Sequence, residues 1–416
     1  MKSSLVGLLL LWSAVGAQAQ AGASGPSREI SALQGAGSSS VDAGDYVYFS
    51  AEGPRSAHGA LTATFAAQVR QALMNLKSAV EAAGLTMDHV VYTTVYLTDI
   101  SQYGEMNRVF GEFFGKMPPA RAVLGVAGLP DPPIEINAVA VRSLSEMRPV
   151  YPPNYKSEEP FSPGILTHDR LFISALPVSA MPSTGPSGDK VLDDPAAQVD
   201  FALDRMKAVV EAAGLDLGHV VFVNPYLTAQ LPMRIMNEHY AHRFEFGNTP
   251  ARATIEVSSL PNGAQIEFTG IAVRDLGKRR TVRPRNMPPS PTASPCVFAG
   301  DTLYCSAKSG FIPGANGGVY SSTTALQLRQ TMRNLLDNLE EADMDFCQVV
   351  TTNVYLDDLA DMRAFDEVYV KYFHGELPAR TTLQQIAPAE RSPDKYGHYP
   401  DLEQVSLLAV RHNCHR

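Results

Sequence analysis

A threefold internal repeat constrains the fold of this chain more than any other feature. Residues 80–85 read Val-Glu-Ala-Ala-Gly-Leu, the same six residues return at 210–215, and a degenerate copy stands at 339–344. The tripeptide Pro-Ala-Arg also occurs three times, ending at Arg121, Arg252 and Arg380. Landmarks that keep their order and their spacing along a chain indicate tandem copies of one structural unit.

Each copy has the same predicted order of elements. A β-hairpin comes first, then a long amphipathic helix, a buried strand rich in β-branched residues, a second helix and two further strands. In the first long helix the apolar residues recur at spacings of three and four: Phe65, Val69, Leu73, Leu76 and Val80. Gly84 and Gly214 follow the first two long helices, where a left-handed residue commonly ends a helix. A mixed sheet with two helices on one face predicts an α+β domain for each copy.

The breaks between copies set the expected domain boundaries. A chain of 416 residues is long enough for two to four domains, and the repeats select three, at 28–146, 152–276 and 294–412. Between the second and third domains, residues 277–293 are rich in proline and arginine. We expect this segment to be an extended, solvated linker.

The first 19 residues have the pattern of an export signal. Lys2 supplies a positive charge, residues 5–15 are mostly apolar, and Ala17-Gln18-Ala19 fits a signal peptidase site. The apolar run is shorter than the ~20 residues that cross a bilayer, so a permanent anchor is the weaker alternative. We expect cleavage after Ala19 and a mature protein that is periplasmic or secreted, without a membrane segment.

The charge balance argues against a nucleic-acid partner. The chain has 34 Lys and Arg against 43 Asp and Glu, a formal net charge of -9. A negative protein without a long basic run is repelled by a phosphate backbone.

Four cysteines lie in the last third of the chain: Cys296, Cys305, Cys347 and Cys414. An even number in an exported protein suits disulfides, buried free thiols are the alternative, and the spacings match no zinc motif. If Gly300-Asp301 is a two-residue hairpin turn, Cys296 and Cys305 are opposite residues with Cα atoms ~4.5 Å apart, which a disulfide tolerates. We therefore expect a disulfide between them, with Cys347 and Cys414 as the remaining pair.

The residues around each Pro-Ala-Arg form a longer motif. In the first copy, residues 113–123 read Phe-Phe-Gly-Lys-Met-Pro-Pro-Ala-Arg-Ala-Val, and Leu-Pro and then Ile-Glu-Ile follow. The second copy has Thr-Pro-Ala-Arg and later Ile-Glu-Phe, and the third has Leu-Pro-Ala-Arg and later Leu-Glu-Gln. These motifs resemble the C-terminal signature of the RidA (YjgF) family of imine and enamine deaminases, over nearly all of the mature chain.

The resemblance implies a chorismate-mutase-like α+β fold that normally forms homotrimers, with ligand sites in the clefts between neighbouring protomers. A chain that carries three copies is then expected to close on itself as an intramolecular pseudo-trimer and to be a monomer in solution. The implied partner is a small-molecule carboxylate, and the implied reaction uses no metal and no organic cofactor.

The resemblance also assigns roles to residues. In the family an Arg after Pro-Ala grips the substrate carboxylate and a Glu on the last strand positions water, while an Asn and a Ser complete the site. The matching positions are Arg121, Arg252 and Arg380; Glu135, Glu267 and Glu403; Asn107 and Asn237; and Ser50, Ser174 and Ser306. The third copy has Asp366 where the others have Asn, so we expect unequal clefts, with the weakest acid binding at Asp366.

These residue types suit such chemistry. Arginine presents a planar fork that binds a carboxylate through two hydrogen bonds, and a glutamate in a cleft can take a proton from an attacking water. The alternatives are a structural ion pair for each Arg and a solvent-facing strand position for each Glu. Recurrence in three copies favours the functional interpretation.

The leading functional hypothesis is a hydrolytic deaminase of reactive 2-imino or enamine acids. A non-catalytic binder of small carboxylates that uses the same clefts is the alternative. An endoribonuclease activity, which some relatives carry by name, is disfavoured by the negative charge.

Overall fold

The computed structural model describes residues 37–176, 194–314, 318–386 and 390–411. The expected signal peptide and Cys414 lie outside the described residues. Among the helices that are described, none is both long and apolar enough to cross a membrane.

The first repeat folds into a mixed five-stranded sheet with two helices. Its elements are β1 (Ser40–Asp42), β2 (Tyr46–Glu52), α2 (Phe65–Ala82), β3 (Val90–Leu97), α3 (Tyr103–Phe110), β4 (Ala120–Gly125) and β5 (Ile134–Val141). The strand order is β1-β2-β5-β3-β4, with β4 parallel to β3 and the other pairs antiparallel. The predicted α+β class and mixed sheet are confirmed.

The second and third repeats copy this order. The second contains β6 (Arg148–Val150), β7 (Gly164–Leu166), β8 (Arg170–Ile173), α4 (Pro195–Ala212), β9 (Val220–Leu227), α5 (Met233–Ala241), β10 (Ala251–Arg252), β11 (Ile255–Glu256) and β12 (Ile266–Val273). The third contains β13 (Arg279–Val282), β14 (Cys296–Ala299), β15 (Thr302–Ser309), α6 (Thr324–Glu341), β16 (Val349–Leu356), α7 (Met362–Tyr369), β17 (Ala379–Gln384) and β18 (Glu403–Val410). In every repeat the Pro-Ala-Arg strand runs parallel to its neighbour at one edge of the sheet.

Part of the expected linker at 277–293 is extended but not solvated, because β13 pairs with β14 and joins the third sheet. Three arginines of this segment have partners in the fold: Arg279, Arg280 and Arg283, whose guanidinium donates to the Gly247 carbonyl oxygen at 3.4 Å. The Arg279 guanidinium donates to the carbonyl oxygens of Val220 and Asn248, and Arg280 stacks over the Phe298 ring.

The long helices form as their sequence pattern predicts. In α2 the residues Val69, Leu73, Leu76 and Val80 are fully buried, and the Thr64 hydroxyl caps the first turn by accepting from the Ala67 N–H. Gly84 and Gly214 end α2 and α4 with φ of 76° and 80°. The third repeat uses Asp343, with φ of 58°, at the corresponding position.

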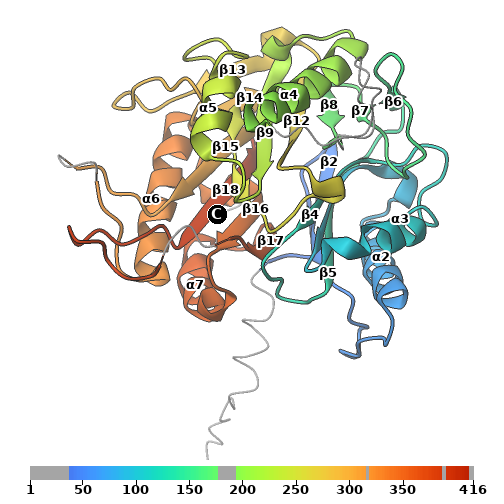
Figure 1. Cartoon of the computed structure of the whole chain (residues 1–416), viewed down its shortest axis with the longest axis horizontal. Helices are drawn as coiled ribbons and strands as arrows, with labels where there is room; N and C mark the ends of the chain where they lie inside the picture. The colour runs from blue at the N-terminus through green and yellow to red at the C-terminus, as the bar shows by residue number, and fades with distance from the viewer. Residues whose placement is uncertain (1–36, 177–193, 315–317, 387–389, 412–416) are drawn as a thin grey trace, which may run out of the picture. The chain divides into compact units, whose positions relative to one another are not determined.

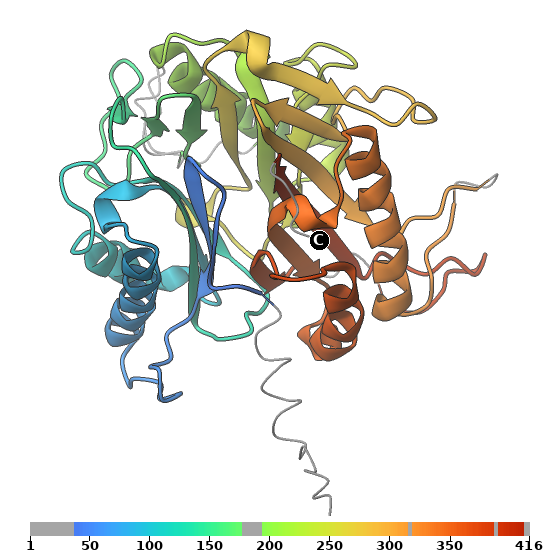
Figure 2. The same cartoon turned by 180° about the vertical axis from the view of Figure 1, so that it is seen from behind.

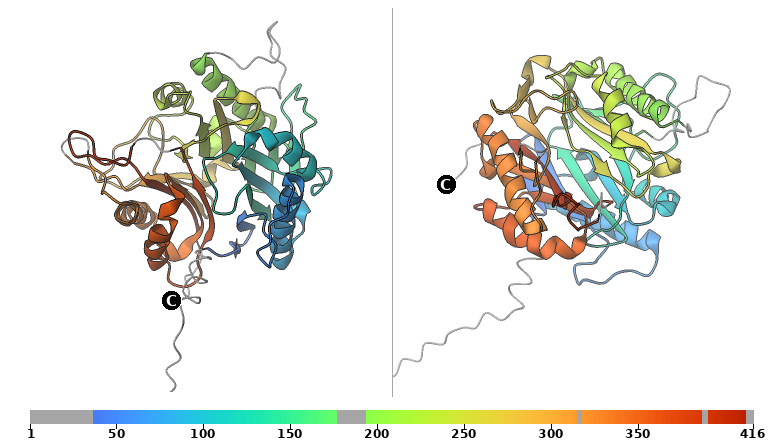
Figure 3. Two further views of the ribbon diagram at one scale, coloured as in Figure 1. Left: turned by 60° about the horizontal axis from the view of Figure 1, so that its bottom comes forward. Right: turned by 60° about the vertical axis from the view of Figure 1, so that its left-hand side comes forward.

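The three sheets share one core within the compact unit formed by residues 36–416. Each repeat has its own apolar cluster between sheet and helices. A further cluster joins Tyr48, Phe172 and Tyr304, one residue from each repeat, with their neighbours. Figures 1 and 2 show the helices on the outside, and the two views of Figure 3 show the sheets facing inward. The repeats thus bury their sheet faces against one another, as the predicted pseudo-trimer requires.

A buried arginine ties the three repeats together at this core. Arg170 of the second repeat donates to the Tyr304 hydroxyl at 2.8 Å, and its guanidinium lies 4.4 Å from the ring centre of Tyr46. Its Nε bonds Asp169 at 3.1 Å, so the charge is neutralised where it is buried.

The predicted disulfide is confirmed. Cys296 and Cys305 are directly opposite residues of β14 and β15, bonded to each other, with Cα atoms 4.1 Å apart. Cys347 is also disulfide-bonded.

Candidate active site

Three clefts form at corresponding positions, where the Pro-Ala-Arg strand of one repeat meets the hairpin of the next. The Arg121 N–H of the first repeat donates to Ser174 Oγ of the second at 2.8 Å. The same bond joins Arg252 to Ser306, and Arg380 to Ser50 of the first repeat. The three arginines therefore lie at the interfaces 1/2, 2/3 and 3/1 between repeats.

The predicted serines fix the backbone at these interfaces. Each hydroxyl donates to the carbonyl twelve residues earlier, at Ser38, Ser162 and Ser294, over 2.6 Å in all three cases. A hydroxyl has one proton, so these groups cannot also donate to a substrate. They hold the arginine strand against the neighbouring repeat.

The second helix of each repeat orients the guanidinium. Asn107 Oδ1 accepts from Arg121 and Asn237 Oδ1 accepts from Arg252, both at 2.7 Å. One turn further along the helix an aromatic ring stacks on the same guanidinium, with Phe110 4.6 Å and Tyr240 5.3 Å from it. These contacts leave each guanidinium with a defined plane, as bidentate recognition of a carboxylate requires.

The third repeat replaces the amide by an acid. Asp366 Oδ1 lies 2.6 Å from Arg380 Nη1, and the two side chains are only 4% and 11% exposed. The charge of Arg380 is therefore neutralised by Asp366. Arg121 and Arg252 have only a neutral amide at the corresponding position.

A residue on the last strand of the next repeat faces each arginine. Glu267 of β12 lines the same small cavity as Arg121, and Glu135 of β5 interacts electrostatically with Arg380. In the strand pairing, Glu135 lies opposite Tyr96 and Glu267 lies opposite Tyr226. The equivalent Tyr355 of the third repeat lies opposite Gln404, which lines the cleft of Arg252.

Glu403, which we expected to be the third catalytic glutamate, is therefore misplaced by one residue. It pairs with Leu356, the position that Ile134 takes in the first repeat, and it is fully buried among core residues. A shift of one residue turns a strand side chain to the other face of the sheet. Glu403 accepts a hydrogen bond from the Thr331 hydroxyl inside the third repeat, and burial raises its pKa well above the usual range.

The three clefts consequently carry different sets of residues. Cleft 1/2 has Arg121, Asn107 and Glu267, cleft 2/3 has Arg252, Asn237 and Gln404, and cleft 3/1 has Arg380, Asp366 and Glu135. Among these clefts, whose residues are all described, only cleft 1/2 combines a neutral partner for the arginine with a facing glutamate.

Burial dominates the electrostatics of the two facing glutamates. It raises the pKa of Glu267 to about 8, although Arg205 and Arg121 oppose the rise. Burial also raises the pKa of Glu135 to about 8, against a hydrogen bond of 2.7 Å from the Asp131 N–H. A raised pKa near neutrality is the property that proton transfer at a working pH requires.

Cleft 1/2 is nearly closed. Its cavity has a volume of about 10 Å³, the least that can hold one water, and Phe161 lies over Arg121 with its ring centre 5.1 Å from the guanidinium carbon. Tyr103 also lines this cavity, and its hydroxyl donates to Glu159 at 2.5 Å, near Arg121. Arg121 Nη1 and Glu267 Oε1 are buried without a hydrogen-bond partner in the described structure.

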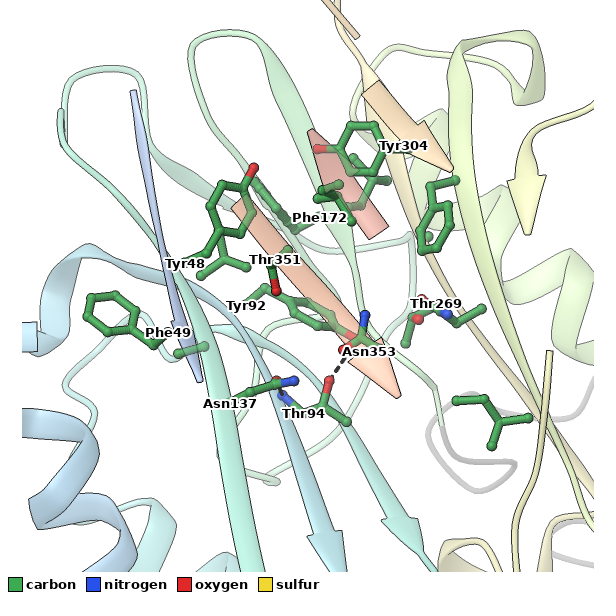
Figure 4. Close-up of a pocket in the computed structure, with 18 of the residues that line it drawn as sticks. Tyr48, Phe49, Tyr92, Thr94, Asn137, Phe172, Thr269, Tyr304, Thr351 and Asn353 are labelled. Atoms are coloured by element: carbon green, nitrogen blue, oxygen red, sulfur yellow. Dashed lines mark hydrogen bonds between the residues drawn. The ribbon is translucent and has the colours of Figure 1, made fainter. Parts of the chain in front are cut away.

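A separate cavity lies between the three sheets and was not foreseen from the sequence. It has a volume of about 90 Å³, and residues of all three repeats line it, including Tyr92, Thr269 and Asn353 (Figure 4). The Thr94 N–H donates to Asn137 Oδ1 at 3.1 Å in its wall. Its polar residues come from strand positions that alternate with core residues, and only the packing of three repeats brings them together.

Comparisons with known proteins agree with the repeat structure. A 2-iminobutanoate/2-iminopropanoate deaminase of Escherichia coli is 41% identical over 107 residues, which cover 24% of this chain and 84% of that protein. A RutC family protein of Pyrococcus horikoshii is 45% identical over 76 residues, and Protein DfrA of Myxococcus xanthus is 42% identical over 76 residues. The matches span 60% and 58% of the length of these last two proteins and 18% of this chain.

Among solved structures, a chorismatase shares the fold over 78% of this chain and 94% of its own, with a TM-score of 0.50 and 15% identity. The family model described as Endoribonuclease L-PSP matches three successive parts of the chain, residues 29–142, 153–274 and 287–388. The chain therefore belongs to the Endoribonuclease L-PSP family, with one family domain in each of its three repeats.

Proposed function

We propose that this protein is a hydrolytic deaminase of small 2-imino acids and that cleft 1/2 is its reaction site. The observation that supports the proposal most directly is the pair of buried atoms without partners, Arg121 Nη1 and Glu267 Oε1. Buried polar groups in native proteins are nearly always satisfied, so a guanidinium and a carboxyl group with open positions in one cleft suit a polar ligand there. The similarity to the Escherichia coli deaminase supports the same class of reaction.

In the proposed reaction, the Arg121 guanidinium binds the substrate carboxylate while Asn107 fixes its plane. A water molecule adds to the imine carbon and forms the new C–O bond, as Glu267 accepts a proton from that water. Glu267 then returns that proton to the nitrogen, and the C–N bond breaks with its electron pair leaving on ammonia. The O–H bond of the added hydroxyl breaks in the same step: its electron pair forms the C=O bond of the 2-keto acid, and its proton passes to Glu267 and then to solvent.

The raised pKa of Glu267 is compatible with this role. Burial in the cleft raises the pKa of the Glu267 carboxyl to about 8. A protonated imine is a cation, and a cation beside a carboxyl favours its ionised form, which is the form that accepts a proton from water. Substrate entry requires lining side chains such as Phe161 and Tyr103 to move, because the cavity has a volume of about 10 Å³.

The test is ammonia release from 2-iminobutanoate generated in situ by an amino acid oxidase, with and without the protein. We expect acceleration by the native protein and its loss in Arg121→Met. The control is Arg108→Met, which changes an exposed arginine one residue from Asn107. Calorimetric binding of 2-oxobutanoate without any acceleration would overturn the proposal in favour of a non-catalytic carboxylate binder.

A further inference from the structure

Cleft 2/3 is much larger than cleft 1/2. Its cavity has a volume of about 410 Å³ and is lined by residues of the second and third repeats together with the segment that joins them, including Met287 and Ser290. Cavities that take small molecules begin at roughly 300 Å³, so this cleft has room for an organic acid.

Two cations line this cavity. Arg252 is held by Asn237, as described above, and Lys308 lies on β15, two residues after Ser306. The corresponding residues of the first and second repeats, two positions after Ser50 and Ser174, are Glu52 and Leu176. The positive charge at this position is thus peculiar to the third repeat.

Neither cation is neutralised. Among the described residues, Lys308 forms no ion pair, and the hydrogen-bond partners of the Arg252 side chain are the uncharged Asn237 and Met236. No carboxylate lines the cavity, since Gln404 stands where the other repeats have glutamate. Burial lowers the pKa of both Arg252 and Lys308, because removing a positive charge from water disfavours the charged form.

We infer that cleft 2/3 is a binding site for a small dianionic acid, such as a 2-ketodicarboxylate, that it holds without hydrolysing. Arg252 takes the carboxylate next to the keto group, and Lys308 takes the second carboxylate. The amide of Gln404 cannot accept a proton from water, so the cleft lacks the group that hydrolysis needs. The inference rests on the proposed function only for the role of arginine as the carboxylate ligand.

The experiment compares two acids of equal length by titration calorimetry. The probes are 2-oxoglutarate, which has two carboxylates, and 2-oxopentanoate, which lacks the second. We expect the native protein to bind 2-oxoglutarate tighter by about tenfold or more, since the charge-assisted bond to Lys308 is available only to the dianion. Lys308→Met should abolish this preference and Lys308→Arg should restore it.

The matched control is Lys278→Met, which removes an exposed lysine outside the cavity and should keep the preference for the dianion. Equal affinity for the two acids in the native protein, or an unchanged preference in Lys308→Met, would overturn the inference. Ammonia release from 2-iminobutanoate is recorded in parallel. Ammonia release without a preference for the dianion would support the proposed function and overturn this inference. A preference for the dianion without ammonia release would support this inference and overturn the proposed function.

Discussion

Carboxylate binding in each cleft should depend on whether the second helix offers the arginine an amide or an acid, as Asn107 and Asp366 do. Asp366→Asn removes the negative charge that faces any acid bound at Arg380. Two like charges ~5 Å apart at an effective dielectric of ~20 repel by about 3 kcal/mol, which is about a hundredfold in affinity. The change should therefore create a new site for 2-oxobutanoate in cleft 3/1, visible in calorimetry as a higher stoichiometry.

The structure indicates that the variant can fold. Removing one member of a buried ion pair normally costs about 3–5 kcal/mol because it leaves a bare charge. Asn107 and Asn237 already hold their arginines through an amide oxygen at 2.7 Å, so an asparagine at 366 can keep the hydrogen bond to Arg380. Thermal unfolding of the variant checks this point, and Glu367→Gln on the same helix is the control for a lost surface charge.

The reverse exchange completes the test. Asn107→Asp should pair with Arg121 as Asp366 does with Arg380, and it should weaken acid binding in cleft 1/2 by about a hundredfold. An unchanged stoichiometry in Asp366→Asn together with full ammonia release in Asn107→Asp would refute the reasoning.

Three further predictions concern stability and assembly. Glu403→Gln should stabilise the protein at pH 8 more than at pH 5. Burial raises the folded-state pKa of Glu403, so the native protein loses stability as the pH rises above the ordinary glutamate pKa. Urea unfolding at the two pH values measures the difference. Replacing Cys296 and Cys305 by alanine should cost about 2–3 kcal/mol of unfolding free energy for a loop of this length, and peptide mapping without reductant should recover the two residues linked. Light scattering should give the mass of a single chain, because the three repeats already cover one another's sheet faces; a trimer of chains would contradict this.

Local patterns predicted most of the fold. The repeat motifs, the apolar stripe of α2 and the hairpin around Gly300 each depend on residues close in sequence, and the structure confirms the elements that they indicate. The sequence also predicted that Arg121 and Asn107, and Arg252 and Asn237, belong to the same sites, and each pair is hydrogen-bonded in the structure. These residues are set by one strand and one helix of the same repeat.

The misplacement of Glu403 has a different origin. The letters Leu-Glu at 402–403 match Ile-Glu at 134–135, but an insertion before them hides the spacing. The alternation of Val405, Leu407 and Ala409 in the core would have placed Glu403 on the inner face, because strand side chains alternate. Counting back from the end of the strand would have found Gln404 instead.

Features that arise from contacts between repeats could not be predicted from local sequence patterns. Glu159 approaches Tyr103 from a segment that has no counterpart among the repeated motifs. Lys308 appears in sequence as one charged residue at the end of a hairpin, and only the packing of two repeats shows that it shares a cavity with Arg252. The closure of cleft 1/2 by Phe161 likewise depends on the second repeat.

The central claim, that cleft 1/2 is the reaction site, is tested most directly by two glutamate variants assayed side by side. Glu267→Gln and Glu135→Gln remove equivalent carboxyl groups from cleft 1/2 and cleft 3/1. Because Arg380 is already paired with Asp366, we expect Glu135→Gln to release ammonia from 2-iminobutanoate at the native rate. Glu267→Gln should be slower by about a hundredfold or more. A native rate in Glu267→Gln, or an equal loss in both variants, would contradict the assignment.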